Sequence, residues 1–81
     1  MTDQEIYQAL NEIFRDVFDD DGITVRAETT AADVSGWDSQ AHITLIVAAE
    51  MRFGVRFRTA EIEKLRNVGE FVQVISKHLK R

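Results

Sequence analysis

The chain has 81 residues and a formal net charge of −4, and it contains no cysteine and no proline. A chain this short buries only about 60–65% of its unfolded surface, so residues 1–81 are expected to form one domain with a small core. The acidic balance argues against nucleic acid as a partner, no apolar run approaches the roughly 18–20 residues of a membrane span, and the absence of cysteine excludes a disulfide framework.

Residues 3–18 are predicted to form the first helix. Thr2 and Glu5 have the spacing of a capping box, in which each side chain accepts a hydrogen bond from the other residue's backbone N–H. Apolar residues then recur at helical spacing, namely Ile6, Leu10, Ile13, Phe14, Val17 and Phe18. The aspartates and glycine at 19–22 are predicted to end the helix, with Gly22 in the left-handed conformation. No basic segment precedes this helix, so we expect no signal peptide and a cytoplasmic protein.

Residues 23–36 are predicted to form a long connection. Three apolar residues in it are interpreted as anchors to the core, namely Ile23, Val25 and Val34. A short helical turn is possible at 31–34, capped by Thr30 with Asp33 three residues later. Trp37 follows, and it is expected to be a partly buried loop residue, with covering of the neighbouring site at Ser39 as the alternative.

Residues 39–53 are predicted to form the second helix, with Asp38 as its N-cap and Ser39 in its first turn. One apolar face is expected to enter the core and consists of Leu45, Ile46, Ala49 and Phe53. A second stripe consists of Ile43, Val47 and Met51. A helix that is apolar nearly all round is either fully buried or contacts something besides its own core, so the second stripe is a candidate partner surface.

The last two helices are predicted at about 60–65 and at 68–79. Thr59 is interpreted as the cap of the short one, and Asn67 and Glu70 as a capping box that starts the other. Val55 and Phe57 are expected to pack inward. The fold class is therefore all-α: a four-helix bundle with three longer helices, one short helix, and a long loop between the first two.

The hydroxyl of Ser39 is expected to be exposed at the positive end of a helix dipole, where a phosphate would be stabilised. His42 lies at i+3 and suggests a Ser–His dyad, but the sequence offers no third orienting group, no nucleophile elbow and no oxyanion pocket. We therefore predict no catalytic residue and no enzyme, with His42 exposed beside the site. A calcium loop around Asp19, Asp21 and Glu28 is also rejected, because its first ligand position is Val17, so no metal site is predicted.

Several motifs of the second half resemble the acyl carrier proteins, including the peptidyl carriers. The family motif is Asp-Ser-Leu, about four turns of helix, and Glu-x-x-Phe-Gly; here Asp38-Ser39-Gln40 is followed by Glu50-Met51-Arg52-Phe53-Gly54. Without a gap, Asn67-Val68-Gly69-Glu70 then corresponds to Thr-Val-Gly-Asp of the family. The resemblance covers nearly the whole chain.

This resemblance implies that Ser39 carries 4′-phosphopantetheine, transferred from coenzyme A by a phosphopantetheinyl transferase that Asp38 would face. The arm would hold acyl groups as thioesters for acyl-loading and acyl-processing enzymes. A groove between the second and third helices would shelter the acyl chain, widened by Ala49 and narrowed by Phe71. Family members of this type are expected to act as monomers without membrane contact.

Three departures from the family pattern point to a specialised carrier. Gln40 replaces the expected leucine, the second helix lacks most of the expected carboxylates, and a basic group is formed by Arg52, Arg56 and Arg58. The residues expected to recognise the transferase or other partners are Asp38, Gln40, Ile43, Val47, Glu50, Met51, Arg56 and Arg58. A specialised fatty-acid, polyketide or lipid pathway is expected; the alternatives are an unmodified carrier-like interaction module and a discrete peptidyl or aminoacyl carrier.

Overall fold

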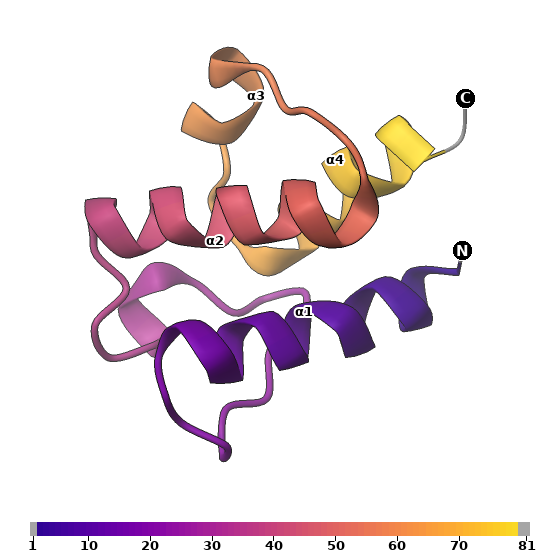
Figure 1. Cartoon of the computed structure of the whole chain (residues 1–81). Helices are drawn as coiled ribbons and strands as arrows, with labels where there is room; N and C mark the ends of the chain where they lie inside the picture. Colours follow the sequence, from indigo (N-terminus) through magenta and orange to yellow (C-terminus); the bar gives the residue numbers. More distant parts are fainter. Residues whose placement is uncertain (1, 80–81) are drawn as a thin grey trace.

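The structure, a computed structural model, describes residues 2–79, and these residues contain helices and no strand. The helices are α1 (Asp3–Val17), α2 (Ser39–Phe53), α3 (Thr59–Glu63) and α4 (Val68–Leu79), with a 3₁₀ turn at Ala31–Asp33 (Figure 1). α1 packs against both α2 and α4. The all-α expectation is confirmed, with α3 as the short helix. No helix in the described part of the chain is long and apolar enough to cross a membrane.

α1 begins with the predicted capping box. The N–H of Glu5 donates to Thr2 Oγ1 at 3.2 Å, and the N–H of Thr2 donates to Glu5 Oε1 at 2.7 Å. These hydrogen bonds, first the one from the Thr2 backbone, hold the pKa of Glu5 below its ordinary value because they favour the charged carboxylate.

The end of α1 differs from the prediction. The helix stops at Val17, and Asp19 rather than Gly22 takes the left-handed conformation, with φ of 50°. Aspartate tolerates this region better than most residues with a side chain. Asp20 Oδ1 then accepts a hydrogen bond from the N–H of Gly22 at 2.9 Å, so the acidic turn is stabilised by its own carboxylate.

The long loop between α1 and α2 is tied to α1 along its length. Val25 and Val34 are buried and Ile23 packs at the edge of the core, so the three predicted anchors are confirmed. Two side chains of α1 add hydrogen bonds: Asn11 Oδ1 accepts from the N–H of Val25 at 2.7 Å, and Arg15 Nε donates to the carbonyl of Ile23 at 2.8 Å. The loop therefore has a defined path over α1 toward the start of α2.

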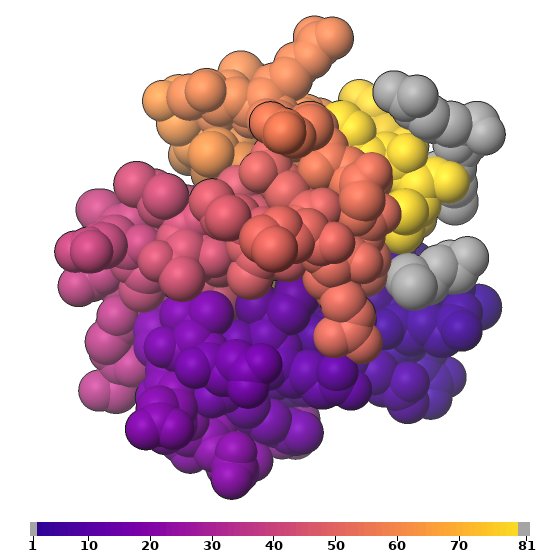
Figure 2. Space-filling model, viewed as in Figure 1, coloured from indigo at the N-terminus to yellow at the C-terminus, as the bar shows by residue number. Residues whose placement is uncertain are grey.

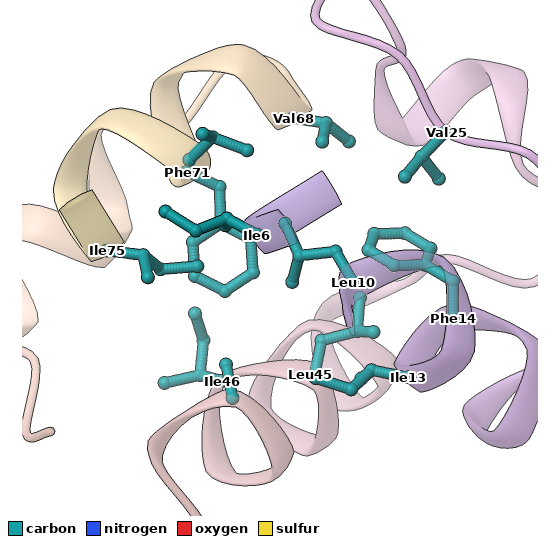
Figure 3. Packing of buried hydrophobic residues seen from close by; sticks show 12 residues of the cluster. Ile6, Leu10, Ile13, Phe14, Val25, Leu45, Ile46, Val68, Phe71 and Ile75 are labelled. Carbon is teal, nitrogen blue, oxygen red and sulfur yellow. The ribbon is translucent and has the colours of Figure 1, made fainter. Parts of the chain in front are cut away.

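The core lies where α1, α2 and α4 meet (Figure 3). Its buried members include Ile6, Leu10, Phe14, Leu45, Ile46, Ala49, Val68, Phe71, Val72 and Ile75. Each fully buried large apolar side chain stabilises the fold by about 1.5–3 kcal/mol relative to exposure. Ala49 is part of this core, fully buried. Its expected role in widening a groove is therefore wrong.

The start of α4 rests on the long loop. The N–H groups of Val68 and Gly69 donate to the carbonyls of Thr29 and Ala27, both at 2.9 Å, which satisfies donors that a helix start leaves free. A Cβ added at Gly69 would lie 3.0 Å from the carbonyl oxygen of Ala27, so glycine permits this close approach. The cap also differs in part from a capping box, since the Glu70 carboxylate accepts from the N–H of Arg66 rather than of Asn67.

α3 is shifted from its predicted position. It covers Thr59–Glu63, and Arg58 rather than Thr59 is the N-cap. The reason is a carboxylate that returns to the helix start: Glu61 Oε1 accepts from the N–H of Arg58 at 2.9 Å. Leu65 lies beyond the helix and packs on the core together with Ile62.

Candidate functional site

Ser39 is the first residue of α2, and its side chain is exposed. Asp38 is the N-cap as predicted, and its Oδ1 accepts from the N–H of Ala41 at 2.8 Å. Among residues 2–79, the N–H groups of Ser39 and Gln40 have no acceptor. Free N–H groups and the helix dipole favour negative charge at this position, so a phosphodiester on Ser39 would be stabilised.

A tight turn presents Ser39 at the surface. Gly36 has φ of 88°, and the N–H of Asp38 donates to its carbonyl at 3.0 Å. The ring of Trp37 packs edge-on against Phe14, with ring centroids 5.2 Å apart. Trp37 thus fixes the turn to α1, which agrees with the expected packing role, and it also lines the groove described below.

His42 is held on both sides of its ring rather than exposed as expected. Trp37 Nε1 donates to His42 Nδ1 at 3.2 Å, and His42 Nε2 lies 3.3 Å from the carbonyl oxygen of Ile62. Because Nδ1 accepts a hydrogen bond and Nε2 lies beside a carbonyl oxygen, the neutral ring carries its proton on Nε2. Neither nitrogen is then free to take a proton from Ser39, which removes the geometric basis of a Ser–His dyad. The side chain instead connects α2 to α3.

A groove of about 630 Å³ opens beside Ser39, between the first half of α2, α3 and the start of α4. Its apolar lining includes Trp37, Ile43, Ile62, Leu65 and Phe71, and the ring of His42 also lines it. Polar residues that line it include Asp38, Ser39, Glu63 and Arg66. Ser39 therefore lines a groove with several apolar side chains, as a sheltering groove would require.

The second stripe of α2 is exposed, as its pattern predicts. Ile43, Val47 and Met51 are 61%, 48% and 80% exposed. Gln40, Arg56 and Arg58 are also exposed, whereas Arg52 forms a surface ion pair with Glu12 of α1 at 3.0 Å. The predicted partner residues thus lie at the surface, with the exception discussed next.

The carboxylate of Glu50 has an internal role. Its Oε2 accepts from the N–H of Phe57 at 2.9 Å, and its carbonyl accepts from the N–H groups of Gly54 and Val55. Glu50 therefore holds the connection between α2 and α3 in place. Its availability to a partner is reduced accordingly.

The sequence reasoning missed a contact between a histidine and a carboxylate that joins α3 to α4. His78 Nε2 lies 3.0 Å from Glu61 Oε1, and the ring of His78 also meets that of Phe57 edge-on. The N–H of Arg58, and then the hydrogen bond with His78, lower the pKa of the Glu61 carboxyl. The partners are 17 positions apart, so no local spacing signals them. No three potential ligands come together as a metal site among residues 2–79.

Comparison with known proteins gives a consistent set of relatives, although no family model matches the sequence. An acyl carrier protein from Acidothermus cellulolyticus is 33% identical over 76 residues, which cover 94% of this chain and 90% of that protein. An acyl carrier protein from Thermotoga maritima is 32% identical over 94% of both chains. The solution structure of a holo acyl carrier protein from Geobacter metallireducens superposes with a TM-score of 0.85, at 44% identity, over 90% of this chain and 84% of that one.

Proposed function

The chain belongs to the acyl carrier protein family, and from this premise we propose that it carries acyl groups as thioesters on a 4′-phosphopantetheine arm attached to Ser39. Proteins of this family are carriers rather than enzymes. The observation that carries the proposal is the exposed Ser39 at the first position of α2, next to the capping aspartate and on the lining of a largely apolar groove.

The residues present fit such an arm. A phosphodiester at Ser39 would meet the free N–H groups of the first turn of α2, where negative charge is favoured. When bound, the arm supplies a thiol that holds the acyl carbon in activated form. Trp37, Ile62 and Phe71 offer apolar surface to the cargo and shield it from water.

A phosphopantetheinyl transferase would install the arm from coenzyme A, and acyl-loading and acyl-processing enzymes would then use it. Asp38 stands beside the hydroxyl and offers a carboxylate to the transferase. The protein is proposed to act as a monomeric cytoplasmic carrier with its own set of partners. Support for that specialisation comes from the exposed Gln40, Ile43, Val47, Met51, Arg56 and Arg58.

The test is the intact mass of the purified chain after incubation with coenzyme A, Mg²⁺ and a permissive transferase. We expect a gain of one phosphopantetheine in the wild type and none in Ser39→Ala. Ser35→Ala is the matched control, since Ser35 is an exposed serine four residues earlier in the adjoining loop and should leave the gain unchanged. No gain in the wild type would favour the second candidate, an unmodified interaction module. That candidate is supported by Gln40, which stands where the family motif has leucine.

A further inference from the structure

Charge is divided unequally between the two halves of the chain. Residues 1–38 contain ten Asp and Glu and two Arg, whereas residues 39–81 contain four Glu and eight Lys and Arg. The formal charges are therefore −8 and +4. Among the described residues the division is also spatial, because α1 and most of the long loop form one side of the molecule, and α2, α3 and α4, with four Glu and six Lys and Arg in residues 39–79, form the other (Figures 1 and 2).

The carboxylates of the basic half are largely engaged within the protein. Oxygens of Glu50, Glu61 and Glu70 accept hydrogen bonds from the N–H groups of Phe57, Arg58 and Arg66. Glu63 on α3 is the remaining one among the described residues of this half, and it is exposed. A partner that approaches α2 therefore meets few acceptors and several exposed cations.

Two of these cations, Arg56 and Arg58, follow directly after α2 in the chain. Phe57 packs inward against Phe71, with ring centroids 5.8 Å apart, and its N–H is bound by Glu50 in the last turns of α2. Arg56 and Arg58 flank Phe57 and are exposed, so they lie at the end of α2 that carries Met51. We define the α2 docking surface as Ile43, Val47, Met51, Arg56 and Arg58.

A second copy of the chain fits this surface poorly. The exposed large hydrophobic residues in the described part of the chain are Ile43, Val47 and Met51, so a second copy has only this same stripe to offer, with the same arginines beside it. Anionic vesicles present the same negative charge as an acidic protein, so they form one arm of the test below. A protein with an apolar pocket and an acidic border is complementary to both the apolar stripe and the two arginines.

We propose that the α2 docking surface binds partner proteins through an apolar groove bordered by Asp and Glu, while the acidic half of the molecule faces away. Positive charge beside the stripe would steer such a partner and reject one with a basic border. Such proteins would be the enzymes that use the carrier, so this proposal rests on the proposed carrier function. The surface itself needs no modification of Ser39, so the two proposals can fail separately.

The test is a titration of the unmodified full chain, followed by amide shifts in two-dimensional NMR. The probe is a synthetic helical peptide with a leucine face bordered by glutamates; the matched probe replaces each glutamate with lysine. We expect the acidic peptide to shift amides at Ile43, Val47, Met51 and 55–58, and to bind at least about tenfold more tightly than the basic peptide at low salt. Its binding should weaken as NaCl rises, since exposed charges are screened.

Two variants with the same change in net charge distinguish a local contact at the α2 docking surface from an effect of the protein's overall charge. Arg56→Glu should weaken the acidic peptide by roughly tenfold, whereas Lys77→Glu on α4 should have little effect. Met51→Glu should abolish binding. The proposal is overturned if the basic peptide binds equally well, if neither peptide shifts α2, or if Lys77→Glu weakens binding as much as Arg56→Glu. It is equally overturned if phosphatidylglycerol vesicles or higher protein concentration alone cause the shifts.

Discussion

Asp38 combines a structural and a proposed recognition role in one side chain. Its Oδ1 caps α2 by accepting from the N–H of Ala41, and its carboxylate is exposed beside Ser39. Asparagine caps a helix about as well as aspartate but carries no charge, so substitution can separate the two roles.

We predict that Asp38→Ala lowers the free energy of unfolding by about 0.5–2 kcal/mol, because the cap is lost. Asp38→Asn should leave stability within about 0.5 kcal/mol and still slow phosphopantetheinylation by roughly tenfold, because the transferase would lose a charged contact. Urea denaturation and a timed mass assay measure the two effects. If Asp38→Asn is modified at the wild-type rate, the aspartate serves only as a cap.

Single residues also show where sequence reasoning reached its limit at the site. Asp38 and Ser39 were predictable because an N-cap and a first-turn position have local signals. His42 was not, since its contacts come from Trp37 in the loop and Ile62 on α3, five and 20 positions away. A histidine at this position of the helix suggested an exposed residue, whereas its two hydrogen bonds place its ring between α2, the loop at Trp37 and α3.

Among the helices and their connections, the end of α2 depends on a backbone conformation. Gly54 has φ of 67° and ψ of 37°, and its N–H donates to the carbonyl of Glu50. An added Cβ would meet nothing within 4 Å, so any cost of a side chain there comes from the left-handed backbone alone.

We predict that Gly54→Ala lowers the free energy of unfolding by about 1–2 kcal/mol. Gly22→Ala is the control in a similar exposed turn. Gly22 is not left-handed, and the added Cβ would lie 3.3 Å from the carboxylate of Asp20. We expect that variant to change stability by less than about 0.5 kcal/mol. If chemical denaturation shows that both variants lose the same free energy of unfolding, the left-handed conformation of Gly54 does not account for its effect.

The longer helices were predicted within one residue because caps and apolar periodicity lie in contiguous sequence. α2 matched in full, from its cap at Asp38 to Gly54. α3 was displaced because its start is set by the return of Glu61 to the N–H of Arg58, which competed with a threonine cap at 59. Docking of the α4 start on the carbonyls of Ala27 and Thr29 depends on tertiary contact and has no local signal.

For the molecule as a whole, acid should loosen the contact between α3 and α4. The folded pKa of Glu61 is below its unfolded value, so this carboxylate adds stability above the unfolded pKa, and that contribution is lost as pH falls through the folded pKa. Glu5 acts in the same direction through the capping box of α1.

We predict that Glu61→Gln is less stable than the wild type at pH 7 and that the difference shrinks as pH falls below about 4.5. Glu63→Gln is the control on the same helix, because Glu63 is exposed and has no hydrogen bond from the described part of the chain. Urea denaturation across this pH range measures both. A difference for Glu61→Gln that stays constant with pH would contradict an ionisation-linked contact.

The chain as a carrier is tested most directly by locating the added group within the protein. Trypsin cuts after Arg26 and Arg52 and leaves a peptide that contains Thr29, Thr30, Ser35, Ser39 and Thr44, so five hydroxyls compete in one fragment. After modification by the transferase, we predict that tandem mass spectrometry places one phosphopantetheine on Ser39. Attachment at any of the other four hydroxyls, or an unmodified peptide, would contradict the proposed role of Ser39.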